Sequence, residues 1–367
     1  MLTGTFLRRV AAAILAAAVG FGPAAAGAAN DLLLLPAVRS QRAVSSMLLG
    51  VARAGQRLVA VGERGHILTS DDNGVTWAQA SVPTSVTLTA VDFPTPAQGW
   101  AVGHDGVVLH TSDGGKTWAK QLDGSQVNGL VLAQVEKVLA ARKAAHGDPS
   151  AIKSLEHFQK DAAAAVEDGP SRPFLDVWFR NERDGLVVGA FGMILRTQDG
   201  GATWTPILDR IDNPDGYHYY AIKRAGETLL LAGEAGMLFR SDDFGASWKR
   251  LKPPYEGSYF GLAADRAVAM AFGLRGRAVR SADGGRTWES VTTASASALS
   301  GGRAFSDGSL WLVASGGTVL RSTDGGKTFS ALGQRFEGAA AVAEAADGSA
   351  VLVGIKGVKR IPKPGES

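Results

Sequence analysis

The chain has 367 residues, of which 45% are hydrophobic and 20% charged, a composition typical of a folded globular protein. It contains no cysteine, which excludes disulfide bonds, cysteine-ligated zinc and a thiol nucleophile. The formal net charge is +3, and removal of Arg8 and Arg9 with an N-terminal leader leaves about +1. That balance lacks the basic footprint of a nucleic-acid-binding protein.

The N-terminal segment has the pattern of a signal peptide. Arg8 and Arg9 precede the short apolar run VAAAILAAAVGF, and the small residues of AAAGAA precede Asn30 at the spacing that signal peptidase needs. The run is too short for a comfortable transmembrane span. We therefore predict a cleaved signal at residues 1–29 and an exported, periplasmic or secreted protein with no transmembrane segment. The paired arginines leave both the general and the twin-arginine export routes open.

An eight-residue element with the pattern [ST]-x-D-x-G-x-[ST]-[WF] recurs six times along the chain. The copies are SDDNGVTW (70–77), TSDGGKTW (111–118), TQDGGATW (197–204), SDDFGASW (241–248), SADGGRTW (281–288) and STDGGKTF (322–329). The sequence positions of successive acids differ by 41, 86, 44, 40 and 41, so the period is near 41 and the long interval holds an insertion. The acids are Asp72, Asp113, Asp199, Asp243, Asp283 and Asp324, and the aromatic residues are Trp77, Trp118, Trp204, Trp248, Trp288 and Phe329.

Each repeat contains four short strand patterns, which in the second copy are LTAVDF, GWAVG, VVLHT and TWAKQL. Four strands in about 40 residues are the signature of a propeller blade. The last segment, 336–362, has inner strands but neither the repeated element nor a fourth strand. We expect residues 31–43 to supply that outer strand and cover the open edge. The predicted fold is an all-β, seven-bladed β-propeller over residues 30–362, with a tail at 363–367.

The insertion between the second and third blades, residues 122–171, has the pattern of an α-helical hairpin. Apolar residues recur at helical spacing in its first half, Gly147 can end that helix, and Asp148 with Pro149 can begin the next. The apolar stripes could pack against each other, against the propeller or against a partner. They comprise Val127, Val131, Val135, Val138 and Leu139 in the first helix and Ile152, Leu155, Phe158 and Val166 in the second.

The repeated element suits a structural turn between the third and fourth strands of a blade. Its Asp can accept hydrogen bonds from amides of its own turn, and its Gly permits left-handed backbone. The alternative is a calcium or sugar site, but acids in six separate blades lie too far apart to share one ligand. We predict a structural role for these residues, and neither a metal nor a cofactor.

The opposite face of the propeller collects the turns between second and third strands and the connections between blades. All five tyrosines lie in two of those connections. Tyr219, Tyr220, Tyr259 and Phe260 could instead begin inner strands and fill the ring. Four arginines recur immediately before the element, where salt bridges between blades are the alternative role. The candidate partner-binding residues are Arg64, His104, Tyr217, Tyr255, Arg275, Arg196, Arg240, Arg280 and Arg321.

The six elements resemble Asp-boxes, the repeats of the bacterial neuraminidase type that occur in sialidases and many other propellers. The longer pattern AVGxxGxILRTxDGGxTW more closely resembles the photosystem II stability/assembly factor family and its exported bacterial relatives, over residues 45–362 without the insertion. This resemblance implies a seven-bladed propeller and a non-enzymatic scaffold or accessory factor for a membrane-protein complex, with an arginine-rich contact surface. Outside photosynthesis, it suggests an exporter of the resistance-nodulation-division type as partner. We expect the chain to be monomeric alone.

The alternative function is a sialidase-like glycoside hydrolase or a carbohydrate-binding propeller. Such an enzyme needs an arginine cluster, a Tyr–Glu nucleophile pair and an acid. The motif RIP at 360–362 lies in the wrong blade, and the neighbours Tyr255 and Glu256 would point apart. Three convergent arginines with a Tyr–Glu pair on the central face would favour the hydrolase. A flat or helix-covered face would favour the scaffold.

Overall fold

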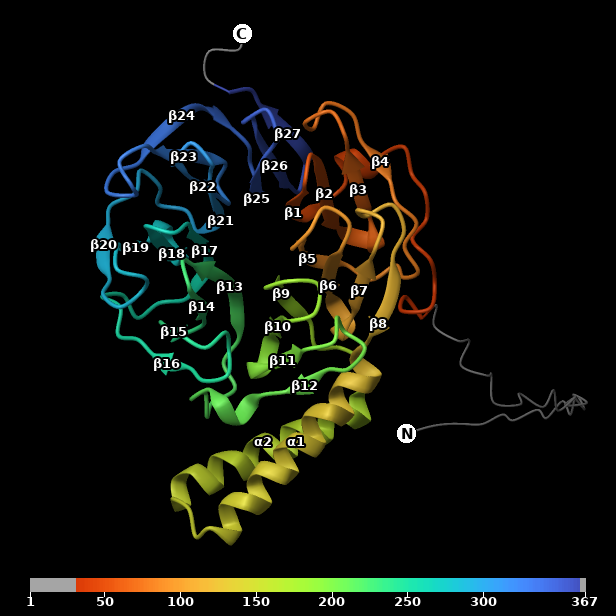
Figure 1. The fold of residues 1–367 in the computed structure, drawn as a ribbon, viewed down its shortest axis with the longest axis vertical. Coiled ribbons are helices and arrows are strands. Elements are labelled where there is room, and N and C mark those ends of the chain that lie inside the picture. Colours follow the sequence, from red (N-terminus) through yellow and green to blue (C-terminus); the bar gives the residue numbers. More distant parts are fainter. Residues whose placement is uncertain (1–30, 364–367) are drawn as a thin grey trace, which may run out of the picture. The chain divides into compact units, whose positions relative to one another are not determined.

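The computed structural model describes residues 31–363, so the predicted signal peptide lies outside the described residues. Seven antiparallel sheets surround a central axis, and within each sheet the strands follow one another in chain order from the axis outward (Figure 1). Six sheets have four strands and the last has three. The predicted seven-bladed propeller with a helical insertion is confirmed.

In the chain, blades 1 and 2 precede the helical insertion and blade 3 follows it. Blade 1 comprises β1 (Leu48–Ala54), β2 (Arg57–Gly62), β3 (Ile67–Ser70) and β4 (Ala78–Gln79); blade 2 comprises β5 (Leu88–Asp92), β6 (Gly99–Gly103), β7 (Val108–Thr111) and β8 (Ala119–Leu122); blade 3 comprises β9 (Phe174–Phe179), β10 (Gly185–Gly189), β11 (Ile194–Thr197) and β12 (Thr205–Pro206).

The remaining four blades complete the ring. Blade 4 comprises β13 (Tyr219–Ala225), β14 (Thr228–Gly233), β15 (Leu238–Ser241) and β16 (Lys249–Arg250); blade 5 comprises β17 (Tyr259–Ala264), β18 (Ala269–Gly273), β19 (Ala278–Ser281) and β20 (Glu289–Val291); blade 6 comprises β21 (Leu299–Ala304), β22 (Leu310–Ala314), β23 (Thr318–Ser322) and β24 (Ser330–Arg335); blade 7 comprises β25 (Ala339–Glu344), β26 (Ala350–Gly354) and β27 (Gly357–Ile361).

The core lies between blades rather than within any one of them. The second strands, such as β6 and β10, are buried at every position because a neighbouring blade covers each of their faces. The hydrophobic clusters accordingly join residues of adjacent blades; Val59 of blade 1, for example, packs in one cluster with Leu109 of blade 2. A single blade could not bury these strands by itself, which explains the repetition.

The N-terminal segment does not supply the expected outer strand of blade 7, so that prediction is wrong. No strand of the described chain pairs with β27 on its outer side. Residues 32–42 instead run along blade 1 from its junction with blade 2, and the Ala37 amide donates to the Val82 carbonyl at 3.0 Å. Leu33 is buried in the cluster between those blades. Burial of this leucine between two blades stabilises that path.

The insertion forms two antiparallel helices, α1 (Gly124–Ala144) and α2 (Pro149–Asp168), which extend outward from the rim of the propeller (Figure 1). The predicted start of the second helix is confirmed, because the Asp148 carboxylate caps it by accepting from the Ala151 amide at 2.9 Å. Val127, Val131 and Val135 bury α1 against blades 2 and 3. The expected apolar face of α2 is only partly correct: Val166 is 45% exposed, and the helix buries Ala162 and Ala165. Alanines allow the two helices to approach closely.

Candidate functional site

The six Asp-boxes share one hydrogen-bonding pattern, which the first copy illustrates. The Thr76 hydroxyl donates to Asp72 Oδ2 at 2.5 Å, and the Thr76 amide donates to Oδ1 at 2.9 Å. The Ser70 hydroxyl donates to Oδ1 at 2.8 Å and accepts from the Gly74 amide at 2.9 Å. Each carboxylate is therefore engaged by its own turn. The same Ser/Thr-to-Asp bonds recur at Asp113, Asp199, Asp243, Asp283 and Asp324.

These hydrogen bonds stabilise the ionised form of the carboxylates. The bonds that the Thr76 side chain and amide donate lower the pKa of Asp72 from 3.8 to about 2. The bonds from Thr203 similarly lower the pKa of Asp199 to about 2. A carboxylate whose acceptor positions are filled by its own turn is poorly placed to act as a catalytic acid. Among residues 31–363, no group of three or more potential ligands is arranged to hold a metal ion.

The box aromatics pack against neighbouring strands. The indole nitrogens of Trp77, Trp118 and Trp288 each donate at 3.1 Å to a glycine carbonyl of the same box. Within the described chain the indole nitrogens of Trp204 and Trp248 are buried without a hydrogen-bond partner. Phe329, which has no such nitrogen, is buried in the cluster that joins blades 5 and 6.

The four recurring arginines serve contacts within the propeller. Arg240 and Arg280 are 8% and 9% exposed. Each donates through Nε to a glycine carbonyl in the Asp-box of the next blade, Gly284 at 2.9 Å and Gly325 at 2.5 Å respectively. Each also pairs with an acid of its own blade. Burial leaves these two guanidinium groups unavailable to a partner. Arg196 lies 3.8 Å from Asp184 and Arg321 lies 2.9 Å from Asp307, and both are half-buried.

Three of the other candidate residues, Arg64, His104 and Arg275, lie exposed at the tips of turns between second and third strands. We call the side of the propeller with these turns and the blade connections the connection face. The middle residue of such a turn adopts left-handed backbone at Arg64, Asp105, Phe191, Ala235 and Arg275, with φ between 51° and 57°. Phe191 is the unusual member, because it is large, apolar and 44% exposed. The other turns have a polar or small residue at this position. An aromatic residue there is the feature of the sequence that could have singled out Phe191.

The tyrosine connections are more buried than expected. Tyr217 and Tyr255 are half-buried and pack against the clusters between blades 3 and 4 and between blades 4 and 5. Tyr219 and Tyr259 begin inner strands and are fully buried. Their burial agrees with the alternative interpretation, in which these tyrosines begin inner strands and fill the ring.

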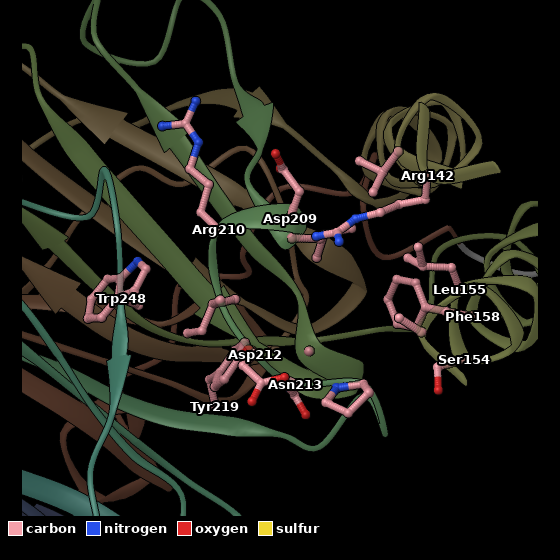
Figure 2. Close-up of a pocket in the computed structure, with 16 residues that line it drawn as sticks. Arg142, Ser154, Leu155, Phe158, Asp209, Arg210, Asp212, Asn213, Tyr219 and Trp248 are labelled. Atoms are coloured by element: carbon pink, nitrogen blue, oxygen red, sulfur yellow. The ribbon is translucent and has the colours of Figure 1, made fainter. Parts of the chain in front are cut away.

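A cleft of about 370 Å³ separates the outer half of the helical hairpin from the connection between blades 3 and 4. Figure 2 shows Leu155 and Phe158 on the hairpin facing the segment that holds Asp209 and Asn213, with Trp248 on the far side. Arg142 extends from the hairpin into the cleft. Gln134 of α1 donates to Asp209 at 3.1 Å, an exposed hydrogen bond that links the two walls. The cleft therefore combines an apolar lining with a charged rim of both signs.

A second cavity, of about 220 Å³, follows the propeller axis. Of the groups that a sialidase needs, its lining has two arginines, Arg53 and Arg303, one tyrosine, Tyr220, and the acids Asp92 and Asp176, but no glutamate. Tyr255 and Glu256 do not line it. The described residues therefore do not assemble three arginines with a Tyr–Glu pair at the centre of the propeller.

Between residues 31 and 363, neither helix of the hairpin is long and apolar enough to cross a membrane.

Seven blades with six Asp-boxes define an Asp-box β-propeller, here with a helical hairpin on its rim. The chain belongs to the family described as photosynthesis system II assembly factor YCF48, whose model matches residues 43–138 and 159–309. The resemblance in the repeat units is thus confirmed.

One curated relative is the photosystem II assembly lipoprotein Ycf48 of Synechococcus sp. (strain CC9902). It is 32% identical over 165 residues, which are 44% of this chain and 49% of the relative. The chain thus matches about half the length of that relative.

Solved structures of low identity share the fold. YCF48 bound to D1 peptide has 16% identity and a TM-score of 0.59, covering 90% of this chain and 99% of that one. YCF48 from Cyanidioschyzon merolae has 15% identity and a TM-score of 0.59, covering 87% and 96%. The WD40 propeller domain of Doa1 has 9% identity and a TM-score of 0.61, covering 91% and 97%. These likenesses show the fold alone.

Proposed function

We propose that this protein is an exported, non-enzymatic binding factor that assists a membrane-protein complex, and that it holds its partner in the cleft beside the helical hairpin. The cleft is the observation that carries the proposal. Leu155 and Phe158 of the hairpin and Leu208 and Ile211 of the connection between blades 3 and 4 line it, so two separate elements contribute apolar walls. An apolar centre with a charged rim is the common anatomy of a protein interface.

The rim suits a protein partner better than a compact neutral ligand. Arg142 and Arg210 bring positive charge to the cleft, and Asp209 and Asp212 bring negative charge. Paired charges of both signs around an apolar centre select orientation and discourage wrong partners. Family membership supports the same class of function, since the family is described as an assembly factor, one relative is named an assembly lipoprotein, and another was solved with a D1 peptide bound.

The test compares two serine substitutions on the same helix. Leu155→Ser places a hydroxyl in the cleft, whereas Val166→Ser changes an exposed residue of α2 outside it. Deletion of the hairpin is a poorer test because Val127, Val131 and Val135 hold the core of blades 2 and 3. The measurement is recovery of membrane-complex subunits with each tagged variant from crosslinked, solubilised membranes.

We expect Leu155→Ser to reduce recovery about tenfold, because loss of one anchor side chain costs more than about 1 kcal/mol. Val166→Ser should recover the same subunits as the unaltered chain. Equal recovery with Leu155→Ser would refute the cleft as the contact. The recovered subunits would also distinguish a photosystem from a resistance-nodulation-division exporter, the partner expected outside photosynthesis.

A further inference from the structure

Four rings form a continuous row across the connection face. The ring centroids of Phe191 and His218 lie 5.0 Å apart, those of His218 and Tyr220 6.1 Å, and those of Tyr220 and Phe260 5.3 Å. The row begins beside the end of α2, where the Arg172 guanidinium lies 4.6 Å from the Phe191 centroid. It ends at the axial cavity, which Tyr220 and Phe260 line.

The backbone conformation of Phe191 is strained. Its φ is 55°, in the left-handed region that a bulky side chain adopts only under strain. With 44% of the residue exposed, burial does not fully offset that strain. The corresponding turns use Arg64, Asp105 and Arg275, so the turn itself does not require an aromatic ring. A ring held under strain and partly in solvent is better explained by a contact with another molecule.

The mouth of the axial cavity on the same face is uncharged. The inner strands present half-buried side chains there. Two of the hydroxyls among them are already used: Thr89 donates to Phe174 O at 2.7 Å and Ser300 to Ala339 O at 2.5 Å. The side chains of this mouth are Leu49, Thr89, Leu175, Tyr220, Phe260, Ser300 and Ala340. The charged residues of the cavity come later on the inner strands, nearer the Asp-boxes, and are Arg53, Asp92, Asp176, Lys223 and Arg303.

We infer that this row and mouth bind an extended segment of the protein partner whose alternate side chains are aliphatic or aromatic. The inference rests on the proposed function, because it assigns partner chemistry to the face beside the cleft. Residues on one side of an extended chain recur about every 6.6 Å, close to the 5.0–6.1 Å between successive rings. An apolar side chain in the mouth would gain burial, whereas a charged one would lose its hydration. The charges beside the row are already engaged, Glu234 with His218 and Arg172 with Phe191, and neither residue lines the cavity.

The probe is a fluorescein-labelled peptide of alternating leucine and serine, eight residues long, compared with the same peptide carrying alanine for leucine. Fluorescence anisotropy measures the affinity of each for the purified chain. The unaltered protein should prefer the leucine peptide by about tenfold, and Phe191→Gly should remove that preference. Asp105→Gly makes the matched change at the same φ of 55° in blade 2, which contributes no ring to the row, and should leave the preference intact.

Thermal unfolding separates loss of the ring from loss of the fold. Glycine accepts the left-handed backbone at both positions, so neither variant should lower the melting temperature. Equal affinity for the two peptides, or an unchanged preference in Phe191→Gly, would overturn the inference. If Phe191→Gly still recovers the membrane complex while Leu155→Ser does not, the inference fails and the proposed function stands. If the leucine preference depends on Phe191 but no variant recovers a complex, the proposed function fails instead.

Discussion

Arg280 Nε donates a hydrogen bond of 2.5 Å to the main-chain carbonyl of Gly325, and so joins blade 5 to the Asp-box of blade 6. The equivalent contact recurs around the ring with different donors: Arg57 to Gly114 at 3.0 Å, Gln121 to Gly200 at 2.9 Å and Arg240 to Gly284 at 2.9 Å. The Asp-box therefore has two roles. It closes its own turn, and it offers a carbonyl to the preceding blade.

Arg280→Met should lower the free energy of unfolding by about 1.5–3 kcal/mol, because the partly buried Gly325 carbonyl loses a charged donor. Glu289, the other partner of Arg280, is largely exposed and can return to water. Arg196→Met is the matched control; its side chain is half-buried and its pair with Asp184 is 3.8 Å long, so we expect a loss below about 1 kcal/mol. Urea unfolding monitored by tryptophan fluorescence measures both. Equal losses for the two variants would contradict the inter-blade role.

Acid should destabilise the propeller through its Asp-boxes. The hydrogen bonds from the Thr76 and Thr203 side chains hold the pKa values of Asp72 and Asp199 near 2, below the ordinary 3.8. The unfolded chain therefore binds protons more readily, and the stabilisation is complete above about pH 4 and lost as the pH falls toward 2. Melting temperatures measured between pH 6 and pH 2 should drop through that window. Asp72→Asn should show a shallower drop, and a flat profile would contradict the expectation.

Gly129→Ala should stabilise the protein by about 0.5–1 kcal/mol, because Gly129 lies within α1 and a Cβ there meets no atom within 4 Å. Gly106→Ala should have the opposite effect. Gly106 has a φ of 65°, and its Cβ would lie 2.9 Å from the Gly124 backbone. Paired urea melts of the two variants test this, and a stabilising Gly106→Ala would show that the turn can relax.

Asn128 couples the two helices of the hairpin. It is 4% exposed, and its side-chain amide donates to Ala165 O at 2.6 Å and Gly169 O at 3.0 Å. Asn128→Ala should cost about 1–3 kcal/mol by leaving carbonyls at the end of α2 without this donor. Limited trypsin digestion should then cut the hairpin faster. Gln134→Ala, which removes an exposed bond to Asp209, should change the rate much less.

Much of the fold was predictable because its determinants are local. The Ser70, Asp72 and Thr76 side chains complete their bonds inside one turn, so a single stretch of sequence contains all of its partners. The Asp148 cap of α2 is local in the same sense. The place of residues 31–42 was not predictable, since Leu33 buries among side chains of blades 1 and 2 that are brought together only by the closed ring.

The site was less accessible to sequence reasoning. The sequence showed that Arg240 and Arg280 recur at the same position of the repeat. It did not show their glycine acceptors, which belong to the next blade, far ahead in the sequence. Phe191 lies in a turn of blade 3 and His218 in the connection that leads into blade 4, and the two become neighbours through the curvature of the ring. The cleft depends on the angle at which the hairpin leaves blade 2, and no local pattern encodes that angle.

By itself the sequence determined the repeat, its strands, its Asp-box turns and the two helices, because each of these is stabilised by hydrogen bonds and side-chain periodicity between near neighbours in the chain. The tertiary structure alone decided which arginines are buried between blades, where the leucine-rich N-terminal segment lies, and which aromatic rings meet on the connection face. Those outcomes depend on packing between blades, whose energy arises only when segments distant in sequence are brought into contact.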